Sequence, residues 1–315
     1  MATQSWFDIF PQCTISNAIA SRFENSWLEE PDISHIVEQR WTKWNTTDFI
    51  SKLKHCSNDI DVWGKHIRTR FRTPITDCRR KLMQLRDKSD ATSNATFLEI
   101  QDKLNTLILQ EEAFWKQRAK VHWLKEGDSN SKFFHATASA RRKRNYIQSI
   151  INEEGQTITN QNDIEITAHL YFETLFRQQE SDITGVINHI PTKITEEDNN
   201  KLLNPFSLDE FRVALFSMHA DKSPGPDGLN PGCYKRFWYL LGPVIYQASN
   251  QWLEPGSFPP QLNHTNIVLI LKIDHPTSMK DYRPISLCSV LYKVITKVLA
   301  NRLKPLLPEC GSISF

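Results

Sequence analysis

The 315-residue sequence lacks most features that mark a secreted, membrane-bound or metal-stabilised protein. Its six cysteines lie far apart and form no Cys-x-x-Cys pair, which argues against a disulfide framework and a zinc site. The longest compact apolar run, 267–271, has five residues, whereas a membrane-spanning helix needs about 20. The first twelve residues contain no basic segment followed by an apolar one, so no secretory signal is expected. We therefore expect an intracellular protein that does not cross a membrane.

The net charge is only +2, from 38 basic and 36 acidic residues, but the basic residues are concentrated in three blocks. Residues 66–88 hold eight Lys or Arg against two Asp or Glu, residues 116–146 hold nine against two, and residues 272–304 hold seven against two. Concentrated positive charge favours a polyanionic partner. A solvated helix face explains any single block at least as well, so both interpretations stay open.

The first half of the chain has mainly helical patterns. Residues 35–88 predict one or two helices. Residues 94–120 predict a long amphipathic helix that begins at a capping box, Thr96 to Glu99. Its apolar positions recur every three or four residues, the spacing of one helix face: Phe97, Ile100, Leu104, Leu107, Ile108 and Phe114 or Trp115.

The middle of the chain predicts a small sheet and one helix. Residues 146–160 place β-favouring residues on both sides of a short polar turn, which indicates a hairpin. Asn162 is expected to cap a helix with one apolar stripe formed by Ile164, Ala168, Tyr171 and Leu175. The polar stretch 178–201 then predicts a domain boundary.

The last third mixes helices and a strand. Ser207 and Glu210 form a second capping box, and the helix that follows ends at the Pro- and Gly-rich turn 222–228. A helical stretch over about 233–253 precedes a short β-branched run, 265–271, which predicts a buried strand. A further helix is expected from Leu291, and Pro305 ends it.

Several blocks, in a fixed order, resemble the reverse transcriptases of non-LTR (LINE-type) retrotransposons in their plant form. The N-terminal blocks are Arg22–Trp27 (RFENSW), Trp115–His135 and Arg141–Asn145. The C-terminal blocks are Lys222–Gly228 (KSPGPDG), Ile267–Lys272, Tyr282–Leu287 with Tyr292–Lys293, and Leu299–Leu303 (LANRL). Together they span nearly the whole chain.

The resemblance implies an α+β protein in which a helical connector precedes a mixed α/β fingers subdomain of a polymerase. It implies four segments: a remnant that follows an endonuclease domain (1–34), the connector with its hairpin (35–177), a linker (178–204) and truncated fingers (205–315). The implied function is a fragment of an RNA-directed DNA polymerase whose partners are an RNA template and a DNA primer.

By the same resemblance, Lys272 and Arg283 match fingers positions that face the nucleotide and template. An Arg fork donates two parallel hydrogen bonds to phosphate, whereas Lys acts as a point charge. Lys222, Asp227 and Gly228 match the fingers turn, in which glycine permits close approach of backbone. In this sequence Leu271 stands where the family usually has proline before the lysine.

No catalytic or metal-binding residue is assigned. Nucleotide addition needs carboxylates that hold Mg²⁺, a cofactor expected for a full-length family member. The family's Tyr-x-Asp-Asp turn has no match, because the sequence contains no Asp-Asp pair. We therefore expect an interrupted polymerase, inactive alone, that also lacks the catalytic segment of the endonuclease.

A second hypothesis is a nucleic-acid-binding or interaction module without polymerase activity. Arg141, Arg142, Lys143 and Arg144 lie near Phe133, Phe134 and Tyr146 in the sequence. Such a basic run with aromatics can bind single-stranded RNA through phosphate attraction and base stacking. Equally, the aromatic residues can be core and the arginines a solvated face.

Overall fold

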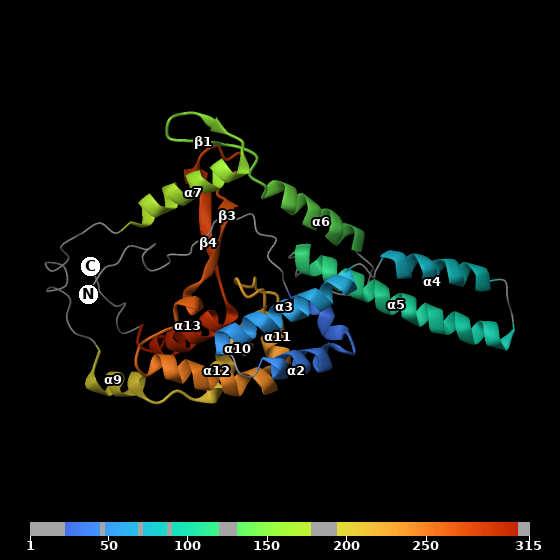
Figure 1. Cartoon of the computed structure of the whole chain (residues 1–315), viewed down its shortest axis with the longest axis horizontal. Helices are drawn as coiled ribbons and strands as arrows, with labels where there is room; N and C mark the ends of the chain where they lie inside the picture. Colours follow the sequence, from blue (N-terminus) through green and yellow to red (C-terminus); the bar gives the residue numbers. More distant parts are fainter. Residues whose placement is uncertain are drawn as a thin grey trace. The chain divides into compact units, whose positions relative to one another are not determined.

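The computed structural model describes residues 23–44, 48–68, 72–86, 90–119, 131–177 and 194–307 (Figure 1). It is mostly helical and has two small antiparallel sheets of two strands each, in agreement with the predicted α+β class. Two compact units divide the chain, one spanning Ser21–Tyr146 and the other containing Ile147–Phe315.

This division differs from the boundary predicted over 178–201. The hairpin and the helix after it share a core with the C-terminal sheet, which joins residues 147–177 to the second unit. Part of the expected linker, Glu196–Leu203, forms a helix. The division into units does not test the assignment of these segments to a connector and fingers, which stays a prediction.

The first unit is all helical. Its elements are η1 (Asn25–Glu29), α2 (Ile33–Lys43), α3 (Phe49–Arg68), α4 (Arg72–Leu85), α5 (Ala91–Ala119) and α6 (Ser131–Arg144). Residues 35–88 thus contribute three helices where one or two were predicted. The predicted apolar stripe of α5 is confirmed: Leu104 is buried, and Ile100, Leu107, Ile108 and Phe114 pack with it against Ile75 and Cys78 of α4.

The predicted start of α5 is wrong. Asp90 caps the helix by accepting a hydrogen bond from the N–H of Ser93 (2.9 Å). Thr96 lies inside the helix, where its hydroxyl donates to the carbonyl oxygen of Thr92 (2.9 Å). Two cap signatures lie within six residues, and the earlier one begins the helix.

The segment 23–29 is a structural part of this unit. Trp27 is 1% exposed, and its ring covers Gly64 of α3 so closely that an added Cβ would lie 2.1 Å from the ring. Glu24 is also 1% exposed and pairs with Arg118 of α5, with Nη2 of Arg118 2.7 Å from Oε1. Gln117 donates to the carbonyl of Phe23 and accepts from the N–H of Asn25. Two of the sequence blocks that carry the resemblance therefore meet in one core.

The second unit combines helices with both sheets. Its elements are β1 (Ile150–Ile151), β2 (Thr157–Ile158), α7 (Gln161–Phe176), α9 (Glu196–Leu203), α10 (Leu208–Phe216), α11 (Pro231–Arg236), α12 (Trp238–Leu253), η2 (Pro260–Asn263), β3 (Thr265–Leu271), η3 (Met279–Asp281), β4 (Tyr282–Cys288) and α13 (Val290–Leu303). The hairpin, the capping box at Ser207, and the helices from Leu208 and near Leu291 are confirmed. The predicted cap Asn162 is wrong, because Asn160, two residues earlier, caps α7 by accepting a hydrogen bond from the N–H of Asn162.

β3 and β4 form a two-stranded ribbon with Ile270 opposite Arg283 and Ile267 opposite Ser286 (Figure 1). The prediction of a buried strand holds for one face only, because Ile267 is buried whereas Ile270 is 42% exposed. The second strand was not predicted. Pro284 lacks an N–H and lowers the strand signal of this segment, but an edge strand tolerates it.

Candidate nucleic-acid interface

The side chains of Lys272 and Arg283 lie on the same face of the β3–β4 ribbon. Side chains alternate along a strand, and directly opposite residues share a face. Arg283 lies opposite Ile270, and Lys272 follows Ile270 by two residues. The N–H of Lys272 donates to the carbonyl of Asp281 (2.8 Å), which continues the ladder past the end of β3. Both cations are exposed.

The loop that joins the two strands is held by Asp281. Its Oδ2 accepts hydrogen bonds from the N–H groups of Thr277 and Ser278, both at 2.9 Å. The N–H of Ser278, with that of Thr277, holds the pKa of the Asp281 carboxyl below its usual value. Lys272 Nζ donates to the carbonyl of Lys280 (2.6 Å) in the same loop. The position of the Lys272 ammonium therefore depends on this turn.

The opposite face of the ribbon packs against the β1–β2 hairpin and α7. Tyr282 and Met279 share a core with Ile150, Ile164 and Phe172. The N–H of Ile151 donates to the carbonyl of Thr277 (2.7 Å), so β1 also bonds to the ribbon loop. Residues 147–177 thus pack against one face of the ribbon. They do not cover the other face, which carries Lys272 and Arg283.

The turn 222–228 lies against the junction of β4 and α13. Gly225 approaches this junction so closely that an added Cβ would lie 2.3 Å from the backbone nitrogen of Ser289. Lys293 Nζ donates to the carbonyl of Ser223 (2.7 Å). Gly228 has φ +73°, a left-handed conformation that favours glycine. The close backbone approach predicted for this turn is made by Gly225, and Lys222 is exposed beside it.

Asp227 lies in this turn, and its carboxylate is surrounded by Tyr234, Leu229 and Lys293. Its Oδ2 accepts a hydrogen bond from the hydroxyl of Tyr234 in α11 (3.3 Å). Burial raises the pKa of the Asp227 carboxyl to about 6, because the hydrogen bonds from Leu229 and Tyr234 and the nearby charge of Lys293 offset only part of the loss of solvation.

Asp227→Asn is expected to change the pH dependence of stability. Because the folded pKa of Asp227 is raised, the wild-type protein loses stability as the pH rises from about 4, where the unfolded acid ionises, to about 6. Asparagine does not titrate, so the variant should lack this loss. At pH 8 its free energy of unfolding should therefore exceed that of the wild-type protein by about 1–2 kcal/mol. Thermal unfolding from pH 4 to pH 8 measures this, with the exposed Asp209→Asn as control. An unchanged pH profile in Asp227→Asn would contradict the prediction.

The basic run at the end of α6 is exposed throughout, from Arg141 to Arg144. Of the nearby aromatic residues, one belongs to the core and two are exposed enough to stack on bases. Phe134 is 1% exposed and belongs to the core, whereas Phe133 is 43% and Tyr146 is 51% exposed. Two aromatic rings thus remain available for stacking near the basic run.

The basic block 272–304 is partly internal. Arg302 uses all five of its N–H donors: it donates twice to the carboxylate of Glu210 and once each to the carbonyls of Leu202, Asn204 and Pro205. Its guanidinium also stacks on Phe206, with 3.8 Å between its carbon and the ring centroid. Lys293, as described above, bonds to a backbone carbonyl. These two cations hold the fold together.

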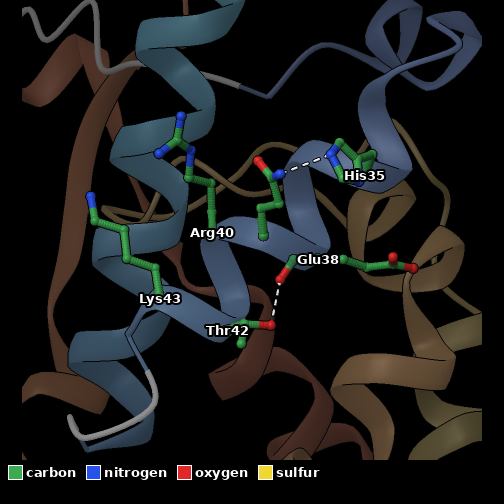
Figure 2. Close-up of a pocket in the computed structure, with 6 residues that line it drawn as sticks. His35, Glu38, Arg40, Thr42 and Lys43 are labelled. Atoms are coloured by element: carbon green, nitrogen blue, oxygen red, sulfur yellow. Dashed lines mark hydrogen bonds between the residues drawn. The ribbon is translucent and has the colours of Figure 1, made fainter.

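A shallow hollow beside α2 is lined by His35, Glu38, Arg40, Thr42 and Lys43 (Figure 2). All of its lining residues belong to that single helix. Its hydrogen bonds, from Gln39 to His35 and from Thr42 to the carbonyl of Glu38, join residues four apart in that helix. We therefore assign no ligand to it.

The described ranges of the chain contain no group of three His, Cys, Asp or Glu side chains arranged to hold a metal ion. No helix in those same ranges is both long and apolar enough to cross a membrane.

No role was predicted for Asp281 or Lys293, although Lys293 belongs to one of the blocks that carry the resemblance. The signature Ser278-x-x-Asp281 is a capping box, so Asp281 could have been found from the sequence. Lys293 had no local signal, because its partner Ser223 lies 70 residues away.

No family model matches the chain. It is 24% identical over 303 residues to an uncharacterised 149 kDa protein of transposon TX1 from Xenopus laevis, covering 91% of this chain and 23% of that protein. It is 26% identical to the Pol polyprotein of the type-1 retrotransposable element R2 from Bradysia coprophila, covering 55% of this chain and 21% of the relative. It is 30% identical to the probable RNA-directed DNA polymerase of transposon BS from Drosophila melanogaster, covering 50% of this chain and 17% of that relative.

The chain is a distant homologue of non-LTR retrotransposon proteins. It spans less than a quarter of the length of each of these relatives.

Proposed function

We propose that this chain provides the connector and fingers of a plant-type RNA-directed DNA polymerase of a non-LTR retrotransposon. The observation that supports this most is the shared face of Lys272 and Arg283, two cations 11 residues apart in the sequence that the ribbon register brings to one exposed surface. Two cations on one face of a ribbon suit the triphosphate of a nucleotide and the phosphates of an RNA template. The relative from transposon BS, whose name specifies an RNA-directed DNA polymerase, supports the same assignment.

The proposal gives this chain a binding role and no catalytic residue. Nucleotide addition uses Mg²⁺ held by carboxylates. The described residues offer no such group of side chains, so we assign them no magnesium site and derive no bond-forming step. We expect the purified chain to bind an RNA template annealed to a DNA primer without extending the primer.

The double substitution Lys272→Ala plus Arg283→Ala tests the proposal. We expect roughly tenfold weaker binding of a primed RNA template, because two phosphate contacts are lost. Fluorescence anisotropy with a labelled primer measures the affinity. The matched control is Arg236→Ala plus Lys304→Ala, which removes one exposed Arg and one exposed Lys elsewhere in the same unit. Equal affinities for the two double variants would reject the ribbon as the binding site, and primer extension by the wild-type chain would reject the purely binding role.

A second candidate function is nucleic-acid binding without any polymerase role, through Arg141, Arg142, Lys143 and Arg144. The exposed rings of Phe133 and Tyr146 near this run favour it. Under this alternative, binding is lost when residues 141–144 are neutralised and is unaffected by the Lys272 and Arg283 substitutions.

A further inference from the structure

The outer edge of β3 has backbone hydrogen-bonding groups that no described strand uses. Along an antiparallel pair, every second residue bonds to the neighbouring strand, and the residues between them turn their N–H and carbonyl groups outward. The bond from the N–H of Lys272 to the carbonyl of Asp281 shows that even-numbered residues of β3 bond to β4. The outward-directed residues are therefore Thr265, Ile267, Leu269 and Leu271. Among the described residues, none outside the ribbon makes a backbone hydrogen bond with this edge.

The two edges of the ribbon differ in how they are protected. On β4 the outward-directed set includes Pro284, which lies opposite Leu269 and has no N–H to donate. Proline and charged residues are common means by which an edge strand is kept from pairing with another chain. The seven residues of β3, TNIVLIL, include neither. The β3 edge can therefore pair along its whole length, whereas Pro284 interrupts the β4 edge.

β3 is complementary to a second copy of itself. When two β3 strands run antiparallel with Val268 opposite Val268, all seven residues of each strand find a partner. Thr265 then lies opposite Leu271 and Ile267 opposite Leu269, so the outward-directed residues of one copy exchange hydrogen bonds with those of the other. The two Val268 side chains form a close, β-branched cross-strand pair. Any shift from this register leaves outward-directed groups of β3 without a partner.

The charges of the ribbon favour the antiparallel direction. Lys272 follows β3 directly, and residues 265–271 carry no charge. Parallel pairing in register would place the Lys272 side chains of the two copies side by side, and like charges on neighbouring strands oppose pairing. Antiparallel pairing about Val268 separates these two ammonium groups by about 27 Å along the strands, at about 3.4 Å per residue.

We infer that two copies of this chain associate through their β3 edges into one four-stranded antiparallel sheet with the strand order β4–β3–β3–β4. Both outer edges of this sheet are β4 strands that carry Pro284, so pairing stops at two copies and no filament forms. The edge contact leaves the face with Lys272 and Arg283 uncovered. The inference therefore does not depend on the proposed function.

Sedimentation velocity of the purified chain tests the association. Between about 1 and about 200 µM, we expect the mass to rise from 36.6 kDa toward twice that value. Val268→Lys places two ammonium groups opposite each other at the two-fold axis and should raise the dissociation constant at least about tenfold. The matched control is Ile285→Lys, which adds the same charge on the same face directly opposite Val268, but on β4, and should change the constant less than about twofold.

Circular dichroism checks that both lysine variants are folded. A wild-type chain that stays monomeric at the highest concentration would overturn the inference, and so would assemblies of more than two copies or equal effects of the two lysines. These measurements use no nucleic acid, so a failure of the dimer is distinct from a failure of the proposed function.

An equal mixture of Val268→Lys and Val268→Glu tests the register. Each variant repels its own copy, whereas the mixture brings opposite charges together at the axis. We expect the mixture to sediment as a dimer at a concentration at which either variant alone is a monomer. A mixture that stays monomeric would overturn the pairing about Val268.

Hydrogen exchange of the wild-type chain tests the same edge without a substitution. The N–H groups of Ile267 and Leu269 should exchange more slowly as the protein concentration rises, because a second copy then bonds to them. The N–H of Ser286, which points outward from β4, is the internal control and should exchange at a constant rate. Exchange at Ile267 and Leu269 that does not depend on concentration would overturn the inference.

Discussion

Arg118→Met is expected to lower the free energy of unfolding of the helical unit by about 3 kcal/mol. Arg118 donates two hydrogen bonds to the carboxylate of Glu24, whose side chain is only 2% exposed. Methionine keeps apolar contact with the ring of Phe114, against which the guanidinium is stacked at 3.4 Å. The main loss is therefore the ion pair, which leaves a buried carboxylate without its cation. Breaking such a pair costs more than forming it contributes.

Urea unfolding combined with hydrogen exchange of residues 23–29 and 114–119 measures the effect of Arg118→Met. The matched control is Arg142→Met on the exposed end of α6, where a surface substitution is expected to change stability by less than about 0.5 kcal/mol. Glu24→Gln added to Arg118→Met should recover part of the loss, because the buried charge is then removed. A loss below about 1 kcal/mol in Arg118→Met would show that the pair does not anchor residues 23–29.

Local patterns predicted the helices well, because their signals lie within a few residues. The stripe along α5 and the capping box at Ser207 are examples, and both are confirmed. The start of α5 was missed because Asp90 and Thr96 carry competing cap signals, and the sequence does not rank them.

The second strand and the anchoring cations could not be predicted, because their partners are distant in the sequence. β4 becomes a strand by pairing with β3, despite Pro284. Glu24 and Arg118 lie 94 residues apart, so nothing local indicates that either is paired. The candidate site shows the same limit. Each cation of the ribbon was found from the sequence, but their shared face follows only from the register that places Ile270 opposite Arg283.

A charge count also failed to distinguish surface cations from structural ones. The block 272–304 was a candidate surface for a polyanion, yet Arg302 within it is 13% exposed at its side chain. At the end of the block 116–146, by contrast, the basic residues of α6 are exposed to solvent. Only the three-dimensional contacts separate these two uses of the same residue type.

Arg302→Lys is expected to lower the free energy of unfolding by about 2–3 kcal/mol although the charge is kept. Lysine has three donors on one nitrogen and cannot reproduce a planar fork that reaches Glu210 and three carbonyls at once. Lost contacts would release residues 202–207 from α13 and leave the Glu210 carboxylate short of hydrogen bonds. The pKa of Glu210, which the Arg302 hydrogen bond now holds below its usual value, should rise toward that value.

Urea unfolding and RNA binding of the same Arg302→Lys protein separate a structural role from a nucleic-acid role. Because all five N–H groups of Arg302 point inward, we expect the folded variant to keep the wild-type RNA affinity and the salt dependence of that affinity. Arg236→Lys is the matched control, since Arg236 is an exposed arginine of the same unit and should change stability by less than about 0.5 kcal/mol. Weaker RNA binding by Arg302→Lys at unchanged stability would contradict the structural role, because it would place the guanidinium on phosphate instead of on Glu210.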